Sequence, residues 1–115
     1  MNFNNYTIKS QEAVQYAFGL AQANNQQGIE TAHIFKGLFH AAGNVVDYLL
    51  NKLSVNSGVI RQALDKIIES FPKVSGGEPF LSSSSNNVLQ KSHGLAQEMG
   101  DRFVSVEHIL LALQD

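Results

Sequence analysis

Apolar side chains recur every three to four residues along most of the chain, which is the spacing of amphipathic helices. The pattern predicts helices over about 8–25, 31–43, 45–53, 56–71, 84–99 and 106–113. Thr7 stands where it would cap the first helix, and Pro72 stops the fourth. No segment alternates with period two, so we expect an all-α fold.

The beginning and the end of this pattern repeat each other. Residues 7–38 align without a gap with residues 82–113, and nine of the 32 aligned positions are identical, where chance would give roughly two. Such a repeat predicts two pseudo-symmetric halves with a seam between them, which is a natural place for a binding groove. We expect repeat one over 1–71, a linker over 72–83 and repeat two over 84–115.

The second repeat holds counterparts of only the first two helices of the first. The counterparts of helices three and four would fall at about 120–146, so we expect residue 115 not to be the natural end of the domain. Core-facing residues of the last helix would then lack partners, and we expect Leu110, Leu111 and Leu113 to be partly uncovered. In the linker, Phe80 and Leu81 are the bulky apolar residues that we expect to pin it to the core.

Composition narrows the class of protein. With 115 residues the chain is one domain with room for a single core, and its net charge of −2 gives no reason to expect nucleic acid or a membrane surface as a partner. The absence of cysteine excludes disulfides, cysteine–zinc sites and thiol catalysis. The N-terminus lacks the features of a signal peptide. These observations predict a soluble, cytoplasmic protein.

Candidate chemistry is sparse. His33 and His108 occupy equivalent positions, but no metal-ligand spacing accompanies them, and we predict that they cap helices or fill the core rather than bind a metal. The serines at 82–85 have no histidine-base context. No GxxxxGK[ST] phosphate loop is present. We therefore predict a domain without a catalytic site, a metal or a cofactor of its own.

Two segments carry a family resemblance. Ile29-Glu30-x-x-His33-Ile34-x-x-Gly37-Leu38, and its second copy over 100–113, resemble the Clp repeat. Two such repeats make the N-terminal domain of Clp-type AAA+ ATPases, and the Pro72-Lys73-Val74-Ser75-Gly76-Gly77 link looks most like the ClpB-type disaggregases. The resemblance implies a module tethered to a hexameric AAA+ ring, which engages unfolded or aggregated polypeptide. ATP and Mg are expected only in the AAA+ modules of the parent protein.

The resemblance also implies a substrate-binding patch between the repeats, made by Thr7, Leu95, Asp101 and Glu107. A shallow apolar groove edged by a few hydrogen-bonding groups would bind unfolded segments weakly and with little sequence preference. Two of these residues also have structural roles to fill, Thr7 as an N-cap and Glu107 in the first turn of a helix, where a carboxylate favours the dipole. Both kinds of role are compatible.

The alternative is an adaptor-docking regulatory domain of a ClpA- or ClpC-type unfoldase. In the ClpC branch, a glutamate just before the histidine of each repeat helps to bind phosphorylated arginine. Here Glu107 precedes His108, but Ala32 precedes His33. Because a methyl group cannot clamp a guanidinium, one of the two sites is lost, which counts against the ClpC alternative.

Overall fold

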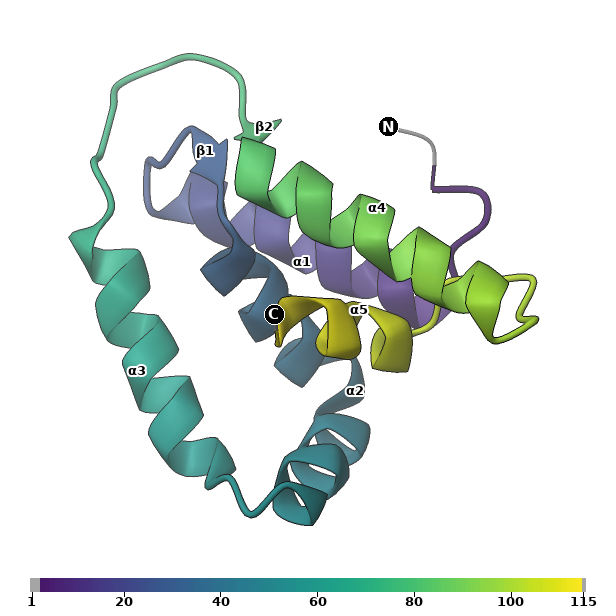
Figure 1. The fold of residues 1–115 in the computed structure, drawn as a ribbon. Coiled ribbons are helices and arrows are strands. Elements are labelled where there is room, and N and C mark those ends of the chain that lie inside the picture. Colours follow the sequence, from purple (N-terminus) through teal and green to yellow (C-terminus); the bar gives the residue numbers. More distant parts are fainter. Residues whose placement is uncertain (1–2, 115) are drawn as a thin grey trace.

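Helices dominate the computed structural model, which describes residues 3–114 (Figure 1). The elements are α1 Ile8–Ala23, β1 Gly28–Ile29, α2 Thr31–Lys52, α3 Ser57–Ser70, β2 Phe80–Leu81, α4 Ser83–Glu98 and α5 Val106–Leu113. Met1, Asn2 and Asp115, at the outer ends of the two predicted repeats, lie outside the described residues. The predicted all-α class is confirmed, with two strands of two residues each as the addition.

The predicted second and third helices are two helical segments of α2 that meet at a kink, so the predicted break between them is confirmed. The backbone leaves the helical region only at Ala42, with φ −147° and ψ 50°, beside the predicted break at Gly43-Asn44. Beyond this kink the helix continues, because Val46 and Leu50 turn into the core and are almost fully buried. The remaining predicted helix ends lie within two residues of the observed ones.

Two short parallel pairings link the repeats to each other. β1 pairs with β2, Ile29 facing Leu81, and Tyr6 forms an isolated bridge to Val104. Ile29 is equivalent to Val104, and Tyr6 is equivalent to Leu81, because each pair is separated by 75 positions in the repeat alignment. The two pairings therefore occupy equivalent places in the two repeats. The segment just before the first helix of each repeat therefore pairs with a backbone segment of the other repeat. Leu81 packs on the core as predicted, but Phe80 is 55% exposed, since alternate residues of a strand point to opposite sides.

α1 and α2 come into close backbone contact at Gly37. A Cβ there would overlap the backbone carbonyl of Ala13, so only glycine fits this contact. The equivalent position in repeat two is Ala112, which already carries that Cβ and is buried. The helices of repeat one are thus joined by a backbone contact that the sequence of repeat two does not reproduce.

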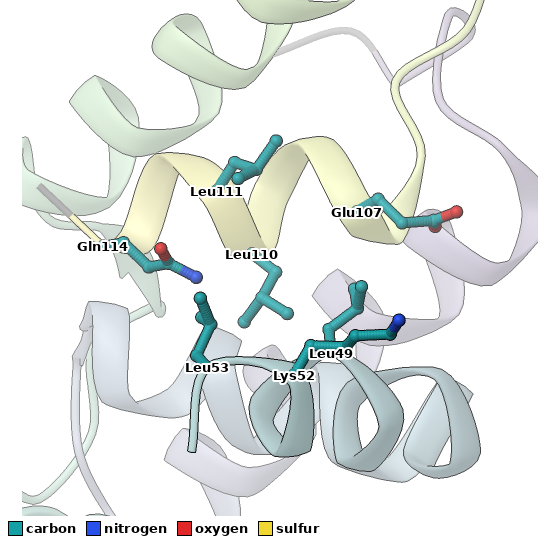
Figure 2. A pocket seen from close by; sticks show the side chains of 7 residues that line it. All are labelled: Leu49, Lys52, Leu53, Glu107, Leu110, Leu111 and Gln114. Atoms are coloured by element: carbon teal, nitrogen blue, oxygen red, sulfur yellow. The ribbon is translucent and has the colours of Figure 1, made fainter. Parts of the chain in front are cut away.

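The core lies where α1, α2, α4 and α5 meet, and its fully buried side chains come from both repeats, among them Ile34, Leu38, Leu89 and Ile109. The predicted exposure of Leu110 was wrong: this side chain is 2% exposed because it points toward the second half of α2 (Figure 2). Leu111 is 42% exposed and Leu113 is half-buried, as expected. Among the described residues, no helix is long and apolar enough to cross a membrane.

Candidate functional site

The same backbone corner joins the first two helices of each repeat. α1 is followed by Asn25 and α4 by Gly100, both in the left-handed region, at φ 56° and 73°. The next residue, Gln26 or Asp101, then donates its backbone N–H to a carbonyl in the last turn of the helix, at 2.8 Å in both repeats. This is the Schellman type of helix end, which satisfies carbonyls that the helix leaves free.

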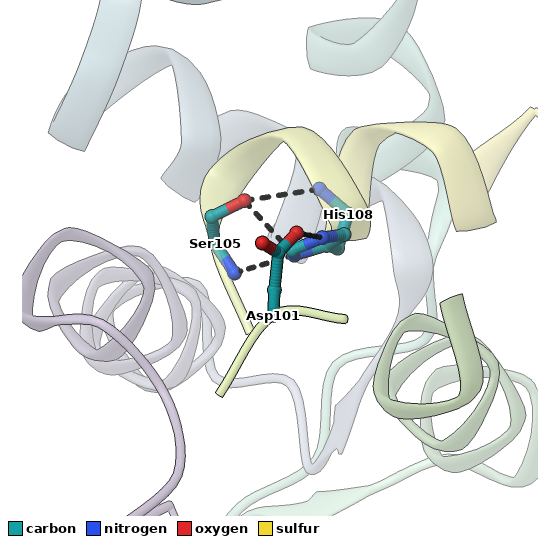
Figure 3. Close-up of polar contacts among 3 residues, drawn as sticks. All are labelled: Asp101, Ser105 and His108. Atoms are coloured by element: carbon teal, nitrogen blue, oxygen red, sulfur yellow. Dashed lines mark hydrogen bonds and ion pairs between the residues drawn. The ribbon is translucent and has the colours of Figure 1, made fainter. Parts of the chain in front are cut away.

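Each corner places a side-chain oxygen on a histidine. His33 Nε2 lies 2.7 Å from Gln26 Oε1, and His108 Nε2 lies 2.9 Å from Asp101 Oδ2 (Figure 3). Nδ1 of each ring accepts the backbone N–H of the residue that caps the helix, Glu30 or Ser105, at 2.9 Å. The predicted capping role of the two histidines is confirmed.

Both ring nitrogens of each histidine are therefore engaged within the protein. Among the described residues, no group of three or more His, Cys, Asp or Glu side chains is placed to hold a metal ion.

The two corners differ in their surroundings. Gln26 is 3% exposed, and its Nε2 donates to the carbonyl of Ile68 at 2.6 Å, which ties the corner to α3. Burial lowers the pKa of His33, while the nearby Glu30 carboxylate and backbone act in the opposite direction. The Asp101 side chain, by contrast, is 52% exposed. Repeat two thus presents to solvent a group whose counterpart is sealed in repeat one.

Three of the four predicted site residues gather at the N-terminal end of α5. The backbone N–H of Thr7 donates to the carbonyl of Val104, just before α5, at 2.9 Å. Thr7 Oγ1 accepts the backbone N–H of Ser10 at 3.2 Å, so its predicted capping role is confirmed. Asp101 reaches the first turn of α5 through His108, and Glu107 lies in that turn, exposed.

Leu95, the fourth predicted site residue, lies on α4 rather than at the start of α5. It is half-buried near the end of α4. More exposed apolar side chains stand nearer to Asp101 in the chain, in the connection between α4 and α5: Met99 is 54% exposed and Phe103 is 47% exposed. The sequence analysis placed Met99 in the predicted helix over 84–99 and did not consider Phe103, which falls between the predicted helices.

A hollow of about 200 Å³ lies between α5 and the second half of α2, on the seam between the repeats (Figure 2). Its lining is mostly leucine, and consists of Leu49, Lys52, Leu53, Glu107, Leu110, Leu111 and Gln114. Glu107 and Lys52 stand at one end, and Gln114 stands at the other. We call this hollow the seam groove. Glu107 is the member of this set that the predicted patch contained.

The α2 side of the seam groove was missed, although the sequence carries a signal for it. Val46, Leu49, Leu50 and Leu53 have the i, i+3, i+4, i+7 spacing of a single apolar helix face. Val46 and Leu50 are buried in the core, whereas Leu49 and Leu53 line the groove at the edge of this face. An apolar helix face that extends past the core is thus a detectable sign of a binding surface.

Comparison with known proteins assigns the family. The family model of the Clp repeat (R) N-terminal domain matches residues 5–115. The chain belongs to this family. The chaperone protein ClpB of Bacteroides thetaiotaomicron is 58% identical over 98% of the chain, and that of Porphyromonas gingivalis is 49% identical over 98%. The Clp domain described here spans 13% of the length of either relative.

A solved structure supports the same fold. The Hsp104 N-terminal domain from Candida albicans matches with a TM-score of 0.86 at 20% sequence identity, over 96% of this chain and 73% of that one. At this identity the likeness concerns the fold alone. The Clp-domain fold therefore accommodates large changes in sequence around the same helical framework.

Proposed function

We propose that this chain is the N-terminal substrate-recognition domain of a ClpB-type, ATP-dependent disaggregase. It binds unfolded or aggregated polypeptide at the N-terminal end of α5 and in the seam groove. The hexameric AAA+ ring, with its ATP and Mg, would belong to other parts of such a protein. This domain contributes binding and no chemistry of its own.

The observation that carries the proposal is the seam groove. Leu53 is 54% exposed and Leu111 is 42% exposed, so the groove offers apolar surface to a partner. Glu107 and Lys52 at one end and Gln114 at the other supply acceptors and donors for the backbone of an extended segment. Unfolded polypeptide is the partner that combines apolar side chains with unpaired backbone groups.

The shallowness of the groove sets the expected strength. A hollow of about 200 Å³ covers only a few side chains of an extended segment. Ordering a flexible chain also costs free energy on binding. We therefore expect a dissociation constant in the micromolar range or weaker, which corresponds to a binding free energy of about −8 kcal/mol or less in magnitude.

The test is a titration of the 115-residue chain with fluorescein-labelled, unfolded β-casein, followed by anisotropy. Replacing Leu53 and Leu111 together by glutamine should weaken binding about tenfold, because partly exposed leucines lose contact area with the ligand. Val59→Gln is the matched control, since Val59 is 61% exposed on α3 and does not line the groove. An absence of casein binding by the wild-type chain would overturn the proposal, and so would ATP hydrolysis by it.

A further inference from the structure

The hydrogen bonds around His108 define the tautomer of its neutral ring. Nδ1 accepts the backbone N–H of Ser105 at 2.9 Å, so this nitrogen presents a lone pair. In the neutral imidazole the proton is then on Nε2, and His108 Nε2–H donates to Asp101 Oδ2 at 2.9 Å. A second proton on Nδ1 would displace the Ser105 N–H from this nitrogen and would have only Ser105 Oγ, 3.0 Å away, as an acceptor, so the backbone half of the α5 cap would be lost.

We propose that His108 is a positioning residue for substrate binding, because its Nε2–H holds one oxygen of Asp101 while the carboxylate receives an N–H group of the bound segment. The inference rests on the function proposed above and deepens it. It explains why a buried side chain of α5, 4% exposed, is bonded to a half-exposed carboxylate.

A neutral donor leaves the charge of the carboxylate intact. A carboxylate has about four lone-pair sites, and the bond from His108 uses one of them. Asp101 is thus held in place but keeps its negative charge and most of its capacity to accept hydrogen bonds. Charge-assisted bonds from backbone or side-chain N–H groups are stronger than neutral ones, which suits a site with few contacts.

Repeat one serves as an internal reference for this arrangement. Gln26 accepts the equivalent bond from His33 at 2.7 Å and spends its N–H₂ group on Ile68, at 3% exposure. Both polar groups of the Gln26 side chain are therefore bonded within the protein. In repeat two the equivalent acceptor is the Asp101 carboxylate, which faces solvent. The bond from His108 therefore fixes a group that is available to a ligand.

Holding the Asp101 carboxylate in place before binding raises affinity through preorganisation. A side chain that must be ordered during binding lowers affinity by about two- to twelvefold, whereas one already held by the protein does not. Loss of the His108 donor should therefore weaken binding about fivefold, which equals about 1 kcal/mol. Loss of the Asp101 charge should weaken it about tenfold, the equivalent of one charge-assisted bond.

Three single variants of the 115-residue chain separate positioning from capping. His108→Gln and His108→Glu both restore the Ser-x-x-Gln or Ser-x-x-Glu capping box with Ser105, but glutamate has no N–H to give to Asp101. Asp101→Asn keeps an oxygen acceptor for His108, as Gln26 does for His33, and removes the charge. The probe is labelled unfolded β-casein, with helical content checked by circular dichroism.

We expect His108→Gln to bind casein within about twofold of the wild type and His108→Glu to bind about fivefold more weakly. In the Asp101→Asn background, His108→Glu should cause no further loss, because the group that it positions is already gone. Equal binding by the two His108 variants, additive losses in the double variant, or unchanged binding by Asp101→Asn would each overturn the inference. A failure of the proposed function is distinct, since the wild type itself would then not bind.

An NMR measurement needs no His108 variant and stands even if one of them does not fold. The neutral ring of His108 should show the Nε2–H tautomer, and added casein should shift the Asp101 carboxyl carbon while leaving that tautomer in place. An Nδ1–H form, or an Asp101 signal that ignores casein, would also refute the positioning role.

Discussion

The two helix corners of this domain share a geometry but differ in the side chain to which the histidine is hydrogen-bonded. In each, a histidine caps its helix through Nδ1 and bonds the preceding loop through Nε2, at 2.7 Å in repeat one and 2.9 Å in repeat two. The partner is the buried amide of Gln26 in one and the half-exposed carboxylate of Asp101 in the other. The two repeats thus hold two copies of the same corner, and the difference in one side chain accompanies a buried corner in repeat one and a solvent-facing corner in repeat two.

Packing distinguishes the same two repeats. Repeat one brings α1 onto α2 through the glycine at position 37, whereas repeat two has alanine at the equivalent position 112. The Gln26 corner is also tied to α3 through Ile68. Repeat one is therefore the more tightly connected half, and substitutions at equivalent positions should not have equal effects.

The largest expected effect is at Gln26. Gln26→Ala should cost about 3 kcal/mol of unfolding free energy, because it leaves the buried His33 N–H without an acceptor and opens a small cavity. Asp101→Ala should cost less than about 1 kcal/mol, since water can replace a half-exposed partner. Urea denaturation of both variants measures the difference. Equal losses would mean that the two corners are structurally equivalent and that our comparison is mistaken.

An intermediate effect is expected at Gly37. Gly37→Ala removes a helix glycine, which by itself would gain about 1 kcal/mol, but the new Cβ would meet a backbone carbonyl that cannot move aside alone. Forced separation of α1 from α2 should cost about 3 kcal/mol, for a net loss of about 2 kcal/mol by the same reasoning.

Gly19→Ala is the matched control for this substitution. Nothing lies within 4 Å of the added Cβ, so this variant should be slightly more stable than the wild type. The close-packing argument fails if Gly37→Ala is as stable as Gly19→Ala in urea denaturation.

Much of this fold could be predicted from the sequence because helix periodicity and caps are local signals. Thr7 and the two histidines were placed correctly on that basis. Gly43-Asn44 likewise located the break inside α2, since the backbone leaves the helical region at the neighbouring Ala42. The pairings of Tyr6 and Ile29 involve too few residues to show an alternation.

The candidate site was accessible from the sequence only in part. Thr7, Asp101 and Glu107 came from the family resemblance, and the fold places all three near the start of α5. The seam groove needed the structure, because its two sides are leucines from segments far apart in the chain. The bond between His108 and Asp101 follows from the repeat only once the Gln26–His33 bond is known.

The smallest expected effect is a dependence of stability on pH that belongs to repeat one. The pKa of His33 is lowered from its ordinary value of 6.5 in the folded protein, because burial disfavours the charged ring. Above pH 6.5 the ring is neutral in both folded and unfolded chains, and this contribution to stability is fully present. As the pH falls below 6.5 toward the lowered pKa, the unfolded chain takes up the proton first, so the folded state loses stability.

Urea denaturation at pH 7.5, 6.5 and 5.5 measures this loss, and two substitutions assign it. His33→Gln keeps a capping box with Glu30 and should flatten the dependence, because it removes the ring that titrates. His108→Gln, the same change at the equivalent corner, should leave the slope attributed to His33 in place. If the wild-type slope survives in His33→Gln, the acid sensitivity lies elsewhere. Protonation of His33 would then not be the cause of the lost stability at low pH.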